Sequence, residues 1–152
     1  MENSLEHSEV SIEPLDSNLY DKALVFLENI FTREQNIPKE LIPLSSETQR
    51  WWCIRSGDEI LGIAAAWMTN SEWHWGRFSI DEKLRGKGLG TKLVIKSFSD
   101  LFEHDTDEIV IDARDVAVKI ILKLGGEVTG ETGYFYEQAI TPMIVRKNSF
   151  VY

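Results

Sequence analysis

The sequence predicts a single α/β (α+β) domain, with a mixed sheet of six to seven strands flanked by about four helices. Segments with strand-like and helix-like periodicity follow one another along most of the chain. The run 60–67 is apolar at nearly every position, as in a strand covered on both faces. A length of 152 residues, 43% of them hydrophobic, suits one core that needs no disulfide or metal.

The first third of the domain is predicted to hold one edge strand and one helix. Residues 10–14 alternate apolar and polar side chains, as a short strand does. Asp16 begins a polar group that can cap a helix, and the apolar stripe of this helix extends toward Pro38. Residues 41–50 form a polar connection with room for a short helix.

Three strands should follow this connection. Residues 51–54 and 59–68 form a hairpin around a short turn that contains Gly57. In the next strand, 73–80, alternation predicts two different surfaces, one in the core and one along a groove. Trp73, Trp75, Arg77 and Ser79 should share one surface, opposite His74, Gly76, Phe78 and Ile80.

The stretch 85–90, Arg-Gly-Lys-Gly-Leu-Gly, lies between this strand and an amphipathic segment, 91–103. Glycine lets the backbone adopt positive φ and lets a ligand approach the N–H groups closely. The free N–H groups and positive dipole of the helix start, with Arg85, Lys87 and Lys92 nearby, favour an anion such as a phosphate. The spacing Gly-x-Gly-x-Gly fits neither a P-loop nor a dinucleotide fold. The alternative interpretation is a tight strand-to-helix connection whose lysines are merely solvated.

The last part of the chain is predicted to add one strand, one helix and two further strands. Residues 108–111 form a buried-type strand, and a helix from Asp115 ends before Gly125. Residues 134–136 and 140–145 are the last two strand candidates. We expect a flexible N-terminal tail, the domain itself and a C-terminal tail at residues 1–8, 9–147 and 148–152.

Composition narrows the range of partners. A formal net charge of −9 argues against a nucleic-acid surface. The lone Cys53 suits a reducing cytoplasm and is expected to be a small buried hydrophobe. Neither a membrane-spanning run nor a signal peptide is recognisable, so we expect a cytoplasmic protein without a membrane partner. His7 and His104 lack metal-ligand spacing, so no metal site is expected.

The chain resembles the GNAT superfamily of N-acetyltransferases in three separate places and in its element order. Arg85-x-x-Gly88-x-Gly90 looks like the acetyl-CoA pyrophosphate loop of that family. Asp112-Ala113-Arg114, followed by Lys123-Leu124-Gly125, resembles the family's later strand end and helix. Glu34-Gln35-x-x-Pro38 is similar to a motif that one branch carries after its first helix, beside the acceptor site. The similarity spans residues 9–146 and implies the GNAT acyl-CoA N-acyltransferase fold.

The resemblance implies acetyl transfer from acetyl-CoA, a co-substrate, to a primary amine of a small molecule or peptide in a ternary complex. The acidic chain would suit a cationic acceptor. Homodimer formation stays open. On this basis the expected cofactor-binding residues are Phe78, Ser79, Ile80, Arg85, Gly86, Lys87, Gly88, Leu89, Gly90 and Arg114. The expected substrate-binding residues are Gln35, Glu34 and His74.

Several residues are candidates for the two proton transfers of the reaction, from the acceptor amine and to the departing thiolate. Glu34 and Glu72 are candidate bases for the amine, each of which can also be a solvated helix-end or turn residue. The family often uses a tyrosine to protonate the departing thiolate, but this chain has Ile121 at that position. Tyr136 or Tyr134, two apart on one face of a strand, are the replacement candidates, or simply packing residues.

Two alternatives to an enzyme stay open, and Ile121 motivates the first of them. The first is a regulatory or interaction module of GNAT fold that binds CoA with little or no catalysis. The second, weaker alternative is a scaffold whose glycine loop binds nothing. Amine-dependent release of the thiol from acetyl-CoA distinguishes an enzyme from a binding module.

Overall fold

The computed structural model describes residues 10–35, 37–38, 42–44 and 46–152, with the backbone alone at 33–35. The predicted N-terminal tail, 1–8, lies outside the described residues. The helices and strands are β1 (Ser11–Pro14), α1 (Tyr20–Gln35), β2 (Gln49–Ser56), β3 (Glu59–Thr69), β4 (Glu72–Ile80), α2 (Leu89–His104), β5 (Glu108–Arg114), α3 (Asp115–Lys123), β6 (Glu127–Val128), β7 (Gly133–Phe135) and β8 (Gln138–Arg146).

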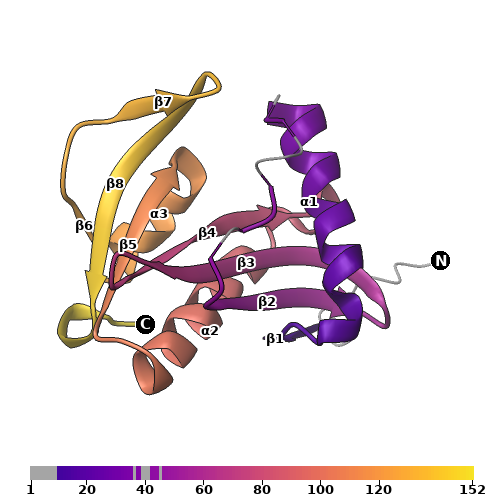
Figure 1. The fold of residues 1–152 in the computed structure, drawn as a ribbon, viewed down its shortest axis with the longest axis horizontal. Coiled ribbons are helices and arrows are strands. Elements are labelled where there is room, and N and C mark those ends of the chain that lie inside the picture. Colours follow the sequence, from indigo (N-terminus) through magenta and orange to yellow (C-terminus); the bar gives the residue numbers. More distant parts are fainter. Residues whose placement is uncertain (1–9, 36, 39–41, 45) are drawn as a thin grey trace.

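All the strands belong to one mixed sheet (Figure 1). Its order is β1-β2-β3-β4-β5-β8-β6, with β7 also paired to β8, so the sheet has eight strands rather than six or seven. The additional strand is β6, whose two residues are too few to leave a periodic pattern. The described residues contain three α-helices rather than about four, because 42–44 and 46–48 form bends and irregular backbone.

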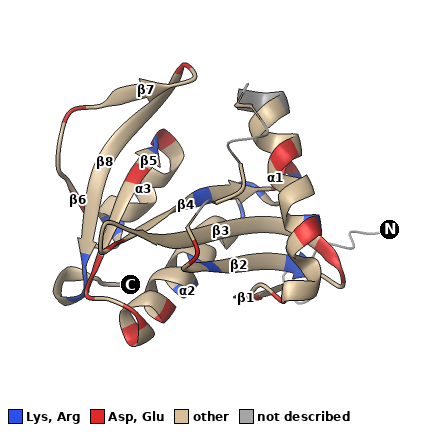
Figure 2. Ribbon diagram, viewed as in Figure 1, with Lys and Arg blue, Asp and Glu red and all other residues tan. Residues whose placement is uncertain are grey.

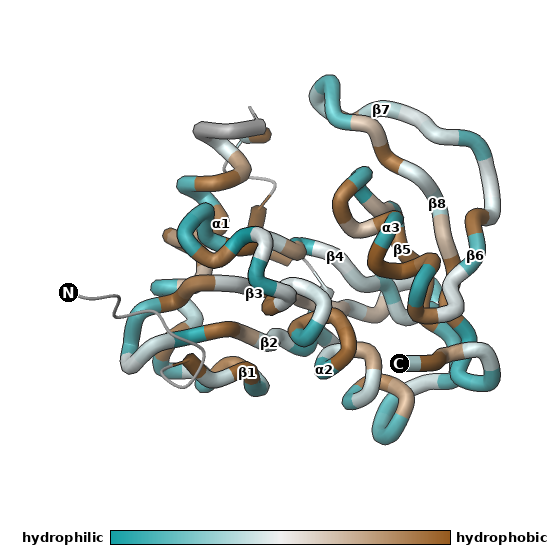
Figure 3. The backbone as a smooth tube through the Cα atoms, turned by 180° about the vertical axis from the view of Figure 1, so that it is seen from behind, coloured by the Kyte–Doolittle hydropathy of each residue, from teal (hydrophilic) through white to brown (hydrophobic). Residues whose placement is uncertain are grey.

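The helices cover both faces of the sheet. Helix α1 packs its apolar side, including Ala23 and Leu27, against Cys53 and Ile63 on one face. Helices α2 and α3 build the larger core on the opposite face, which contains Trp52. Successive strand residues point to opposite faces, which explains why Trp52 and Cys53 enter different cores. Figure 3 shows the apolar segments in the strands and helices and the hydrophilic ones in the loops.

Two indole groups attach α2 to the sheet. The Trp52 Nε1–H donates to Asp100 Oδ2 at 2.8 Å, and the Trp75 Nε1–H donates to Ser97 Oγ at 2.8 Å. Lys96 Nζ lies 3.2 Å from Asp100 Oδ1, one helical turn away. Because both indoles, Ser97 and Asp100 are largely buried, their hydrogen bonds fix the rotation of α2 as well as its position.

A β-bulge in β4 changes which side chains share a face. Gly76 pairs with Ala65 and Ser79 pairs with Ile63, so Arg77 and Phe78 together oppose one residue of β3. Arg77 adopts a left-handed φ of 54°. The predicted alternation along 73–80 is therefore wrong beyond Gly76. Phe78 joins the face of Trp75, with ring centroids 5.4 Å apart.

Among the described residues, β4 and β5 form the one parallel pair of strands, and they separate soon after they meet. Their ladder consists of His74 with Val110 and Trp75 with Ile111. β5 instead pairs with β8 over its whole length, 108–114. Beyond Trp75 the two central strands therefore leave an opening in the middle of the sheet.

The end of the chain, expected to be a tail over 148–152, is attached to the domain. The Phe150 ring centroid lies 6.0 Å from that of Phe98 and 5.3 Å from that of Phe102, both on α2. The Val151 N–H donates to the Leu124 carbonyl oxygen at 3.0 Å. Gly125, which ends α3 at a φ of 99°, leaves no room for a Cβ beside the Ser149 carbonyl.

Acidic and basic residues are dispersed over the loops and helices (Figure 2). In the part of the chain that the structure describes, no helix combines the length and the apolar character needed to cross a bilayer.

Candidate active site

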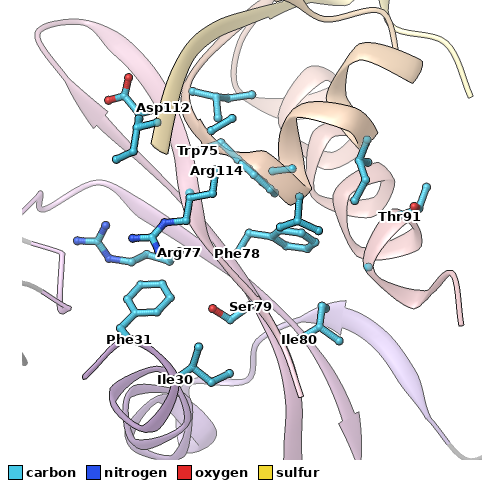
Figure 4. A pocket seen from close by; sticks show the side chains of 18 of the residues that line it. Ile30, Phe31, Trp75, Arg77, Phe78, Ser79, Ile80, Thr91, Asp112 and Arg114 are labelled. Atoms are coloured by element: carbon cyan, nitrogen blue, oxygen red, sulfur yellow. The ribbon is translucent and has the colours of Figure 1, made fainter. Parts of the chain in front are cut away.

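A cavity of about 740 Å³ occupies the opening between β4 and β5. Figure 4 shows that it is bounded by α1 on one face of the sheet and by the start of α2 on the other. This volume is within the usual range for small-molecule and cofactor sites. The cavity therefore connects the glycine loop to the α1 side through the sheet.

The glycine loop forms one end of this cavity. Gly86 and Gly88 line it with φ values of 82° and 78°, and a Cβ at either position would meet no atom within 4 Å. Gly88 is the N-cap of α2 and has no side chain to satisfy the first N–H groups of the helix. The helix thus begins with unpaired donors and the positive end of its dipole at the cavity, which is an arrangement that binds anions.

Gly90 has a different role in the same loop. A Cβ at this position would lie 3.2 Å from Phe78 Cζ and 3.5 Å from Ile80 Cγ1. Glycine is needed here so that the first turn of α2 can approach β4 closely. This close approach brings the start of the helix next to the open edge of the strand.

The open edge of β4 presents backbone donors to the cavity. The Asp81 N–H donates to the Leu61 carbonyl oxygen of β3 at 2.8 Å. Backbone groups of successive strand residues point to opposite edges, so those of Ile80 point away from β3. The Ile80 carbonyl accepts a hydrogen bond from Arg85 Nε at 2.9 Å, which attaches the loop to this edge. Ser79 lines the cavity nearby with a hydroxyl that is buried and has no hydrogen-bond partner.

Eight of the ten predicted cofactor-binding residues line this one cavity: Phe78, Ser79, Ile80, Arg85, Gly86, Gly88, Gly90 and Arg114. The other two do not line it. Lys87 is exposed, and Leu89 is buried in the core beneath α2. Most of the residues expected around the cofactor therefore lie together, and their role in binding it stays a prediction.

At the α1 side, two arginines from neighbouring strands enter the cavity. Arg77 lies over the Trp67 ring at 5.4 Å and donates from Nε to the Ile42 carbonyl at 2.8 Å. Arg114 lies over the Phe31 ring at 5.4 Å. Burial lowers the pKa of both guanidinium groups, and the Arg114 charge lowers the pKa of Arg77 further. Arg77 is not among the predicted site residues, because the bulge turns it out of the predicted alternation.

His74 also lines the cavity, as expected of a substrate-binding residue. Its ring stacks on Trp67 with centroids 6.1 Å apart and an interplanar angle of 13°. The Nε2 atom is buried without a hydrogen-bond partner and lies 3.7 Å from Glu72 Oε1. The imidazole thus lies on the wall of the cavity, within reach of a bound molecule.

The tyrosine candidates lie outside the cavity. Tyr134 is 77% exposed, and Tyr136, 44% exposed, belongs to the turn before β8 with a φ of 48°. The idea that both point to one face of a strand is therefore wrong, since β7 ends at Phe135. Phe135, between them, lines the cavity instead.

The helical position that usually carries a tyrosine is apolar in this chain. Ile121 is completely buried, and its neighbour Ile120 lines the cavity. Glu34 and Gln35 lie in the last turn of α1, but their side chains are outside the described part of the structure. The motif that they begin, Glu34-Gln35-x-x-Pro38, stays a prediction.

Cys53 is a buried free thiol in β2, on the face covered by α1. Burial, and to a smaller extent the Glu13 carboxylate, raise the pKa of this thiol to about 11. The thiolate is therefore scarce at neutral pH, and the residue serves the core.

A mixed sheet that opens between two parallel strands, with a glycine-capped helix start facing the opening, has the architecture of the acyl-CoA N-acyltransferases. The acetyltransferase (GNAT) domain family matches residues 17–147. The chain belongs to this family, whose members are acyltransferases that use acetyl-CoA.

Solved structures agree on the fold. ElaA from Escherichia coli has a TM-score of 0.75 at 20% identity, covering 90% of this chain and 97% of its own. An acyl-CoA N-acyltransferase from Pseudomonas aeruginosa has a TM-score of 0.74 at 14% identity, covering 89% and 97%. Spermidine N-acetyltransferase from Vibrio cholerae, solved with CoA and spermine, has a TM-score of 0.68 at 14% identity, covering 94% and 98%. Among curated proteins, none matches the chain.

Proposed function

We propose that this protein is an N-acetyltransferase that moves an acetyl group from acetyl-CoA to a primary amine of a small molecule or peptide. The single observation that carries the proposal is the continuous cavity from the glycine loop to the α1 side. Such a cavity allows cofactor and acceptor to be bound together, as direct attack in a ternary complex requires.

The cofactor would occupy the side of the cavity that contains the glycine loop. Backbone N–H groups around Gly86, Gly88 and Gly90 would hold its pyrophosphate, helped by the dipole of α2. Donors on the open edge of β4, from Phe78 to Ile80, would hold the chain that carries the thioester and polarise its carbonyl. A fixed donor aimed at a developing oxyanion contributes about 3 kcal/mol to the transition state.

In the proposed reaction the amine nitrogen attacks the carbonyl carbon, the C–S bond breaks and the thiolate leaves. A base must first take a proton from the ammonium form of the acceptor, because amines are mostly protonated at neutral pH. His74, on the cavity wall beside Glu72, is suited to accept it directly or through a water. Glu34 stays the second candidate.

Two residues are candidates for protonating the departing thiolate. Tyr136 and Tyr134 stay predictions, and either role requires the β7–β8 hairpin to move toward the bound cofactor, because both side chains lie outside the cavity. A thiolate is a tolerable leaving group, so absence of the acid would slow the reaction by about 10²–10⁴-fold without preventing it.

A second candidate function is a CoA-binding module with little catalysis. The apolar pair Ile120 and Ile121, at the place where a proton donor would be expected, favours it. Both candidates predict that CoA binds at the glycine loop, and they differ only in turnover.

The test combines binding with turnover. Acetyl-CoA and CoA, but not ATP, should raise the melting temperature by about 5–10 °C at roughly 100 times their dissociation constants, since binding then adds about 2.7 kcal/mol. Thiol release from acetyl-CoA is then followed across a panel of amino acids, polyamines and short peptides. Cys53 should not disturb the thiol measurement, because it is buried and protonated.

The outcomes separate the candidates. Amine-dependent thiol release supports the transferase and excludes the inactive module. Stabilisation by CoA without release from any amine supports the module. Absence of stabilisation by CoA and acetyl-CoA would overturn both.

A further inference from the structure

The acceptor side of the cavity contains two positive charges close to each other. Figure 4 shows the guanidinium groups of Arg77 and Arg114 side by side near the Phe31 ring. They come from β4 and β5, the two strands that separate around the cavity, so neither residue is near the other in sequence. The charge of Arg114 is close enough to lower the pKa of Arg77.

One atom of this pair, Arg114 Nη1, is buried without a hydrogen-bond partner in the protein without a ligand. Arginine keeps its charge in proteins, so burial of both groups cannot be relieved by loss of a proton. Among the described residues, no salt bridge to Arg114 is present. Asp112 lines the cavity but is exposed, and it forms no ion pair with Arg114.

Neighbouring residues hold the guanidinium groups of Arg77 and Arg114 in positions that suit a planar anion. The Arg114 Cζ atom lies over the Phe31 ring and the Arg77 Cζ atom over the Trp67 ring, each 5.4 Å from the ring centroid. The hydrogen bond from Arg77 Nε to the Ile42 carbonyl further fixes Arg77. A planar guanidinium binds a carboxylate through parallel hydrogen bonds, which a compact ammonium cannot do. A carboxylate between the two arginines would remove their repulsion and supply the missing partner of Arg114.

We infer that the acceptor is an amino acid or a closely related amine with a free carboxylate, and that Arg77 and Arg114 bind this carboxylate. The inference rests on the proposed function and specifies its substrate class. Arg114 then belongs to the acceptor site rather than to the cofactor site, where the resemblance placed it. A cationic acceptor, suggested by the overall acidic charge, is disfavoured at this position.

The test measures binding separately from turnover. N-acetylated amino acids, which mimic the product, are titrated in the presence of CoA against the matching N-acetylated amino amides, which lack only the carboxylate charge. The acids should bind roughly ten- to a hundredfold more tightly than the amides. Arg114→Gln should remove this preference while the affinity for acetyl-CoA stays unchanged.

Arg146→Gln is the matched control, because Arg146 is half-exposed and pairs with Glu108 and Glu127 away from the cavity. It removes the same charge and should keep the preference for acids. Equal binding of acids and amides, or binding of neither, would overturn the inference. An Arg114→Gln variant that loses acetyl-CoA affinity would also overturn it and return Arg114 to the cofactor site.

The panel of free amines described for the proposed function tests turnover independently of these binding measurements. If the acids bind preferentially but no amino acid releases the thiol, the carboxylate site stands and the transferase proposal fails. If amines without a carboxylate release the thiol as fast as amino acids do, the transferase stands and the carboxylate site fails.

Discussion

Single residues in the glycine loop meet two different physical demands. Gly86 and Gly88 supply a positive φ beside empty space that a ligand can fill. Gly90 supplies the missing Cβ that lets α2 approach Phe78. Substitutions at the three glycines should therefore have different effects. A side chain at Gly86 or Gly88 would be strained and would enter the space left for a ligand, whereas one at Gly90 would disturb the packing of α2 on β4.

Gly88→Asp should weaken acetyl-CoA binding by about a hundredfold or more. The new carboxylate would occupy the helix N-terminus where the pyrophosphate is expected, and like charges there repel. Titration calorimetry of acetyl-CoA measures the effect directly.

Gly57→Asp is the matched control for this experiment. Gly57 has a φ of 58°, and a Cβ there also meets nothing within 4 Å, but the residue lies in the β2–β3 turn. It adds the same charge and comparable backbone strain, about 1–3 kcal/mol. If both variants lose the same affinity, the anion site is not at the glycine loop.

The position of a single residue can be predicted only where a local sequence pattern determines it. The loop glycines are recognisable because their spacing is itself the signal. Arg77 is not, because its direction depends on a bulge in β4 that leaves no trace in the apolar pattern. Tyr136 was misplaced for a related reason, since a turn with positive φ begins one residue after Phe135.

At the scale of elements, α2 connects the chemistry to the core. Its first turn borders the cavity, while its second half is anchored by the indoles of Trp52 and Trp75. Any rotation of α2 would displace the N–H groups at Gly88. The buried hydrogen bonds therefore keep the donors of the proposed cofactor site in place.

Asp100→Ala should lower the free energy of unfolding by about 1–3 kcal/mol. The substitution leaves the Trp52 indole N–H buried without an acceptor and also removes the ion pair with Lys96. Urea denaturation measures the change. Asp100→Asn retains an acceptor oxygen and should recover most of the loss, whereas an Ala variant as stable as the wild type would show that the bond contributes little.

Most elements were predictable because their patterns are long enough to be periodic. Helix α2 and the apolar strand β3 agree with expectation within a few residues. β6 was missed because it has two residues and pairs only through β8. The separation of β4 from β5 could not be predicted from the sequence either, since it depends on contacts between distant segments.

At the scale of the whole molecule, the fold places two chemically different ends in one cavity. Backbone donors at a helix start face the proposed cofactor end, and side-chain guanidiniums face the proposed acceptor end. The sheet opening joins the two ends, so a single structural irregularity, the short β4–β5 ladder, creates the space for both molecules.

The paired arginines lie inside a protein whose formal net charge is −9. An amino acid with an acidic side chain, which keeps a net negative charge when its amine is protonated, is therefore repelled at long range and attracted only after it enters the cavity. Salt weakens the distant repulsion first, because the Debye length falls from about 30 Å at 0.01 M to about 10 Å at 0.1 M. At saturating acetyl-CoA, kcat/KM for an amino acid with an acidic side chain should thus rise as salt is added over this range, the reverse of ordinary electrostatic steering.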